Sequence, residues 1–169
     1  MLAVDTNVLM YAHRREASEH EVAQRVVTEL AEGDSPWAIP WPCVYEFFGV
    51  VTHPKIWRDT ASTPQQAWAQ LEMWLGSPSL RLLHESRAFS CVLRPLLTLP
   101  RLRGPIVHDA RIAALCLAHG VDALLTRDRD FSLFPRLRRR GPFVERCSAR
   151  GTCVSLRYRT LLPTASRER

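Results

Sequence analysis

Apolar residues along this chain alternate between short runs and longer stretches that have a helical period. The short runs are "LAVD", "WAIP", "LRLL" and "DALLT". Each predicts a buried strand, because it is short and has no helical spacing. The stretches between them are typical of amphipathic helices, and strands that alternate with such helices indicate a parallel sheet covered on both faces. The sequence therefore predicts an α/β fold with four strands.

Capping residues place the ends of several of these helices. Ser18, with Glu21 three residues later, predicts a capping box, and Thr63 predicts a second N-cap. Gly120 marks the end of a strong helix, and Pro95 is expected to interrupt another. The expected helices cover residues 7–14, 18–33, 42–54, 63–78, 85–99 and 107–120.

Charge divides the chain into two parts. The formal net charge is +6, yet from Arg136 onward there are ten arginines and two acidic residues, so the body is mildly acidic. We expect a folded domain over residues 1–142 and a basic, partly disordered extension over 143–169. Four arginines of "RLRRR" are candidates for contacts with an RNA backbone. They are Arg136, Arg138, Arg139 and Arg140.

Four acidic residues belong to four separate predicted elements. Asp5 and Asp128 follow strands and so fall at the carboxyl edge of the sheet, where ligands of open parallel sheets gather. Glu46 lies within an almost wholly apolar helix, and Asp109 lies close to the start of one. Each has an ordinary alternative explanation: Asp5 and Asp109 can cap helices, Glu46 can lie on the one solvent-exposed stripe of its helix, and Asp128 can be a solvated turn residue.

Taken together, the acids favour a bound cation. Carboxylates that crowd one another raise each other's pKa, and a hard divalent ion relieves that repulsion. A site with oxygen ligands alone favours Mg²⁺, with Mn²⁺ as a substitute, over Zn²⁺. Such an ion can activate water and stabilise charge on a phosphoryl oxygen, which serves phosphodiester hydrolysis.

Four segments together resemble the PIN domain family, and more closely the VapC toxins of bacterial toxin–antitoxin pairs. They are "VDTNVLMYA", "YEF", "HDARIAA" and "LLTRDRDF", in the family's order, and the likeness extends from Met1 to about Pro142. The resemblance implies a three-layer α/β fold and a Mg²⁺-dependent endoribonuclease. It also implies a homodimer and a cognate antitoxin that inhibits the enzyme.

The resemblance also assigns roles to residues of this chain. Asp5 and Asp109 match the firmest metal contacts, Glu46 matches a residue that holds the metal or its water, and Asp128 completes the pocket. The residues that would orient these carboxylates are Thr6, Asn7 and Thr126, with Asp130 as a more peripheral acid. Thr126 has the alternative of a strand-end hydroxyl that bonds nearby backbone.

Other classes of protein fit the sequence less well. An aspartyl phosphatase would want Asp-x-Asp after the first strand and a later lysine, whereas this chain has Asp5-Thr6-Asn7 and a sole lysine, Lys55. A catalytically inactive PIN-like module that binds RNA or protein is the main alternative. Five scattered cysteines favour reduced thiols and a cytoplasmic location. Neither a signal peptide nor a stretch long enough to span a membrane is evident.

Overall fold

A parallel five-stranded sheet forms the centre of the computed structural model, which describes residues 1–141. The strand order is β3-β2-β1-β4-β5, and every neighbouring pair is parallel. The predicted parallel sheet is confirmed, and its four expected strands are all present. The strands are β1 Leu2–Val4, β2 Trp37–Pro40, β3 Leu80–Leu83, β4 Ala123–Leu125 and β5 Arg139–Arg140.

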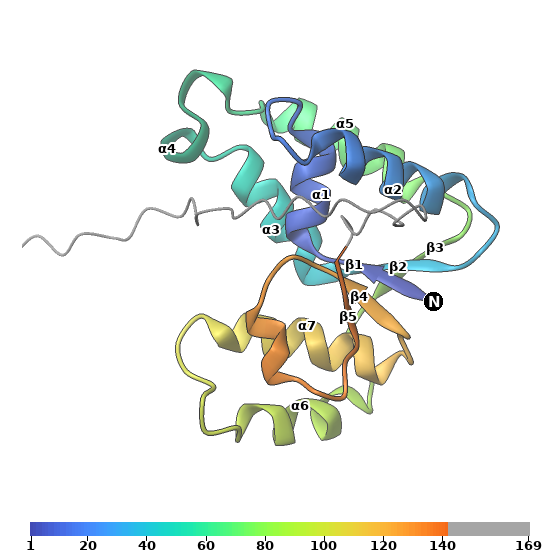
Figure 1. Ribbon diagram of the computed structural model, residues 1–169, viewed down its shortest axis with the longest axis vertical. Coiled ribbons are helices and arrows are strands. Elements are labelled where there is room, and N and C mark those ends of the chain that lie inside the picture. The colour runs from blue at the N-terminus through green and yellow to red at the C-terminus, as the bar shows by residue number, and fades with distance from the viewer. Residues whose placement is uncertain (142–169) are drawn as a thin grey trace, which may run out of the picture.

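Helices cover both faces of the sheet, as Figure 1 shows. Helices α1, α2, α3 and α5 lie on one side, and α6 and α7 lie together on the other. The predicted three-layer arrangement is therefore confirmed. The helices are α1 Thr6–His13, α2 His20–Glu32, α3 Trp41–Val51, α4 Pro54–Trp57, α5 Pro64–Leu75, α6 Phe89–Leu97 and α7 Ile106–Ala118, with short 3₁₀ turns η1 Arg58–Thr60 and η2 Asp130–Leu133.

The core explains why the strands read as uninterrupted apolar runs. Trp37, Ile39 and Leu124 on the strands are fully buried, as is Phe47 on α3. A sheet with helices on both faces has no wet side, so its central strands lack the polar alternation of a half-exposed sheet. Because helices pack on both faces of the sheet, the carboxyl ends of its strands are held in fixed positions.

Several details differ from the sequence prediction. Ser18 is not the N-cap of α2, because its hydroxyl donates to the Glu19 carboxylate at 2.6 Å and the helix begins only at His20. Pro95 lies inside α6 rather than interrupting it, and the helix ends two residues later. Thr63 does cap α5, with Gln66 completing a capping box. Residues 142–169 lie outside the described part of the chain, so the expected extension stays a prediction.

Two helices begin directly at the carboxyl ends of strands. Asp5 separates β1 from α1, and Trp41, the first residue of α3, follows the last residue of β2. Such direct junctions hold the side chains at the start of each helix against the sheet edge. The candidate site is built at this edge.

Candidate metal centre

Asp5 is buried at the junction of β1 and α1, with 4% of its surface exposed. It is the N-cap of α1, and its Oδ1 accepts a hydrogen bond from the Thr6 backbone N–H at 2.8 Å. Its Oδ2 accepts from the Asn7 amide and, at 2.6 Å, from the Thr126 hydroxyl. The capping role and a role in the site are therefore compatible, since these donors hold the carboxylate in one orientation.

Thr126 links the ends of β1 and β4. Besides donating to Asp5, its Oγ1 accepts from the Asp128 backbone N–H at 2.9 Å and from the Asn7 amide at 3.0 Å. Both explanations of this hydroxyl therefore hold, because it bonds nearby backbone and also orients Asp5. The position of Asp128 depends on the same atom as that of Asp5.

Replacing Thr126 with valine should weaken metal binding without removing a carboxylate. The variant loses the donor to Asp5 and the acceptor for Asp128, so we expect unfolding to require about 1–3 kcal/mol less free energy. Loss of such orienting partners typically lowers metal affinity roughly 10- to 100-fold. Calorimetric titration with Mg²⁺ measures this. Thr52→Val is the matched control, since Thr52 bonds only the Phe48 carbonyl in its own helix among the described contacts; equal affinities in both variants would contradict the role of Thr126.

Glu46 approaches the site from α3. It is half-buried, and its Oε2 accepts a hydrogen bond from the Thr6 hydroxyl at 2.7 Å. Thr6 follows Asp5 directly, so this bond ties α3 to the start of α1. Glu46, the acidic residue of this otherwise apolar helix, therefore lies beside the other acids of the site rather than in bulk solvent alone.

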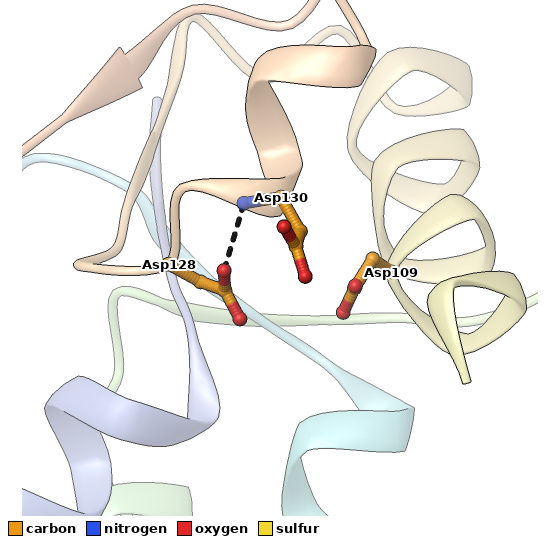
Figure 2. Close-up of side chains that lie close together, drawn as sticks. All are labelled: Asp109, Asp128 and Asp130. Carbon is orange, nitrogen blue, oxygen red and sulfur yellow. Dashed lines mark hydrogen bonds between the residues drawn. The ribbon is translucent and has the colours of Figure 1, made fainter. Parts of the chain in front are cut away.

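Three further carboxylates converge from α7 and from the loop after β4. One oxygen each of Asp109, Asp128 and Asp130 lies within 4.8 Å of the other two, and Figure 2 shows the three side chains pointing toward one another. The Asp130 backbone N–H donates to Asp128 at 2.8 Å, which closes the loop into this shape. Asp109 lies within the first turn of α7 but is not its cap, because the helix already begins at Ile106.

The pKa values show that the acids influence one another. Burial raises the pKa of Asp5 to about 6, even though hydrogen bonds from Thr126 and Thr6 oppose the rise, and the charges of Glu46 and Asp128 add to it. The pKa of Asp109 rises to about 7, first through burial and then through the charges of Asp128, Asp5, Asp130 and Glu46. All five acids therefore share one electrostatic environment, although Asp5 and Glu46 are not in the tight group of three.

This arrangement fits a divalent cation. The donors are carboxylate oxygens, which Mg²⁺ and Mn²⁺ prefer, and within residues 1–141 the main charges acting on the pKa of Asp5 and Asp109 are those of other acids. A bound cation would lower the pKa values of Asp5 and Asp109 and so keep both carboxylates ionised at neutral pH. Asp109, Asp128 and Asp130 could hold such an ion, with Asp5 and Glu46 at its side.

The arginines proposed for RNA contact lie on or next to β5, the edge strand that the sequence did not predict. All four are exposed. Arg140 lies at the carboxyl edge of the sheet, where its carbonyl accepts from the Thr126 backbone N–H. Arg138 lies at the other end, where its charge lowers the pKa of Asp122 after the stronger effects of the chain's amino terminus. Arg139 donates to the Asp128 carbonyl at 3.1 Å and so supports the acidic loop.

The structure adds one residue to the predicted set and places another differently. Asp130 was expected at the periphery but lies in the group of three. Cys43 is fully buried on α3, with its sulfur 3.8 Å from Asp5 Oδ1. The pairing of β1 with β4 and of β1 with β2 brings these residues together. This pairing cannot be predicted from the local sequence of any one strand.

Comparisons with known proteins agree with this architecture. The sequence profile of the PIN domain matches residues 2–137. Ribonuclease VapC43 of Mycobacterium tuberculosis is 34% identical over 142 residues, which cover 84% of this chain and 95% of that protein. Ribonuclease VapC48 of the same species is 31% identical over 139 residues, which cover 82% of this chain and 95% of that protein.

Solved structures share the fold at lower sequence identity. VapBC2 from Rickettsia felis, bound to a promoter DNA fragment, has a TM-score of 0.61 and 20% identity, covering 82% of this chain and 96% of that chain. VapC20 of Mycobacterium tuberculosis, described as a toxin that cleaves the sarcin–ricin loop, has a TM-score of 0.59 and 19% identity, covering 78% and 93%.

The fold, the acidic sheet edge and the family match together identify the class of protein. A parallel sheet with an acidic carboxyl edge, together with a profile match over most of the length, is the signature of a PIN domain. This chain belongs to the PIN domain family and, within it, to the VapC group.

Proposed function

We propose that this protein is a Mg²⁺-dependent endoribonuclease, the VapC-type toxin of a toxin–antitoxin pair. The observation that carries the proposal is the convergence of five acids, from α1, α3, α7 and the loop after β4, at one sheet edge. The names of its relatives as ribonucleases give the reaction class. Mn²⁺ would substitute for Mg²⁺, since both prefer oxygen ligands.

Each acid has a distinct part in the proposed reaction. Asp109, Asp128 and Asp130, whose oxygens lie within 4.8 Å of one another, would be the nearest ligands of the cation, and Asp5 would help to hold it from their side. When bound, the cation supplies charge neutralisation at a phosphoryl oxygen and acidifies water. Glu46, held at Oε2 by Thr6, uses its other oxygen to accept a hydrogen bond from the attacking water. Thr126 and Asn7 keep the Asp5 carboxylate in position as charge develops.

Arginines at the rim would hold the RNA backbone beside this acidic edge. Arg140 lies at the same edge as the acids, whereas Arg138 lies at the opposite end of the sheet. Among the predicted contacts, Arg136 and Arg140 are exposed and carry no described side-chain bond. Arg139 would act indirectly, through the Asp128 carbonyl.

Replacing Arg140 with glutamine should weaken RNA binding by removing one phosphate contact. We expect the slope of log affinity against log salt to fall by about 1. Fluorescence anisotropy with a labelled single-stranded RNA, measured from low to moderate salt, gives that slope. Arg138→Gln is the control, two residues earlier and just before β5; equal losses of affinity in the two variants would refute the proposed contact at Arg140.

The activity itself has a direct test. Purified protein with total RNA and Mg²⁺ should produce discrete cuts that disappear with EDTA and in Asp5→Asn. The second candidate is an inactive PIN-like module that binds RNA or protein, and it predicts RNA binding with no cuts at any metal concentration. The complete set of acids favours the enzyme, because a binding module has no need for a half-buried cluster of like charges.

The proposed partners follow from the same family. Structures of relatives include VapBC2 of Rickettsia felis and FitAcB of Neisseria gonorrhoeae, so a cognate antitoxin protein would neutralise this enzyme. A homodimer and a cytoplasmic location complete the proposal. In the described residues, no helix is both long enough and apolar enough to cross a membrane.

A further inference from the structure

A pocket lies on the same carboxyl edge of the sheet as the acidic residues. It has a volume of about 220 Å³ and is lined by Trp41 and Pro42 at the start of α3, by His84 after β3, and by Arg111 and Leu115 on α7. The acids gather at the ends of β1 and β4, while this pocket lies at the ends of β2 and β3. Neighbouring strands are roughly 5 Å apart, so the pocket and the acidic site are adjacent.

The same two helices carry both features. On α3, Pro42 lines the pocket and Glu46 follows one turn later on the same helix face. On α7, Asp109 belongs to the acidic group and Arg111 lines the pocket. A strand of nucleic acid that lies across the acidic group would therefore meet this pocket within a nucleotide or two.

The lining offers one aromatic ring, that of Trp41, and a hydrogen-bonding rim. Tyr45 does not line the pocket; it packs edge-on against Trp41, with ring centroids 5.6 Å apart, and is 60% exposed. Arg111 donates from Nε and Nη2 to the same oxygen, Oε1 of Glu85, at 2.9 and 2.7 Å. A guanidinium has five N–H donors, so donors remain for a ligand, and the other Glu85 oxygen can accept.

We propose that this pocket binds one unpaired nucleobase of the RNA strand, next to the phosphate that is cut. The proposal rests on the ribonuclease function above and adds the residues that grip a flanking base. Trp41 would stack on the ring, Tyr45 would support Trp41 from its edge, and the Arg111–Glu85 pair would meet the polar edge of the base. The volume is below the roughly 300–1,000 Å³ of sites for drug-sized ligands, which suits a single planar ring system better than a protein helix.

Charge also favours this occupant. The acidic group repels an RNA backbone, whereas the ion pair of Arg111 with Glu85 adds no net negative charge at the adjacent position. Stacking of a base on an aromatic side chain contributes about 1–3 kcal/mol. That contribution is independent of salt, so it can be separated from phosphate contacts by experiment.

The test compares variants on RNA and on a backbone without a base. Labelled single-stranded RNA hexamers, and the same hexamers with abasic ribose at each position in turn, are titrated against the full chain in the metal-free state. We expect Trp41→Ala to lower affinity for RNA about 5- to 100-fold, at low and high salt alike, with no loss for the hexamer that is abasic at the bound position. Trp41→Phe, which keeps an aromatic ring, should keep most of the affinity. Trp68→Ala, an aromatic residue on α5 that is 50% exposed, should also keep it.

Each other outcome overturns the pocket proposal. Unchanged RNA affinity in Trp41→Ala, or an equal loss on every abasic hexamer, would exclude base stacking there. A change in oligomeric state by sedimentation with unchanged RNA affinity would assign this face to a contact between protein copies. Cleavage is measured separately: wild-type protein that binds as expected but cuts no RNA refutes the enzyme, whereas Trp41→Ala that cuts with unchanged KM refutes the pocket.

Discussion

Asp109→Asn is expected to abolish RNA cleavage and, at the same time, to stabilise the metal-free protein. The asparagine removes a negative charge from the group that would hold the cation, whose electrostatic contribution is several kcal/mol. We therefore expect cleavage to fall at least about 100-fold. The stability gain has the opposite cause: Asp109 has its pKa raised to about 7 by burial and by four neighbouring acids, so its charge opposes folding above that pH.

The gain in stability should be visible at pH 8. Allowing for solvent screening of this partly exposed group, it amounts to about 1–2 kcal/mol in the free energy of unfolding. Urea denaturation in EDTA measures it, and gel analysis of RNA with Mg²⁺ measures cleavage. Asp34→Asn is the matched control, since Asp34 is exposed in the loop before β2. A variant at Asp109 that still cuts RNA, or that is less stable than wild type without metal, would contradict the assignment.

Mg²⁺ should stabilise the protein far more at pH 8 than at pH 5. In the metal-free state Asp5 and Asp109 have their pKa values raised to about 6 and about 7. Groups with raised pKa values support folding below their unfolded values, near pH 4, and that support is lost as the pH rises through 6 and 7. A bound cation needs the ionised forms, so its contribution grows over the same interval.

The size of this effect follows from mass action. With free Mg²⁺ at about 100 times its dissociation constant, the added free energy of unfolding is about 2.7 kcal/mol. Melting curves with and without Mg²⁺ at pH 5, 6, 7 and 8 should show a widening difference in Tm. Asp5→Asn should flatten that dependence. A Tm difference that is equal at pH 5 and pH 8 would show that these two carboxylates do not hold the ion.

Much of the fold could be predicted because the strands are buried on both faces. Runs such as those ending at Asp5 and Thr126 have no polar alternation, and only a sheet covered by helices explains them. The fifth strand, Arg139–Arg140, escaped prediction because it is two polar residues long and lies at an exposed edge. Its pairing with β4 depends on tertiary contacts that leave no local pattern.

The site could be predicted only in part, for a similar reason. The carboxyl-edge position of Asp5 and Asp128 follows from parallel strands, Glu46 and Asp109 stand out as acids in apolar helices, and the family motifs assigned their roles. That Asp130 joins the tight group depends on the turn in which its N–H bonds to Asp128, which spacing alone does not reveal. The cap predicted at Ser18 was wrong, because its hydroxyl bonds to the Glu19 carboxylate instead of capping the helix.

The central claim is that distant acids converge on a shared divalent cation, and anomalous X-ray diffraction from crystals containing Mn²⁺ tests it most directly. At pH 8 we predict an anomalous peak between the carboxylates of Asp109 and Asp128, at about 2.1 Å from their oxygens, and no such peak in crystals of Asp109→Asn. Manganese bound elsewhere, with these carboxylates vacant or turned apart, would contradict the account.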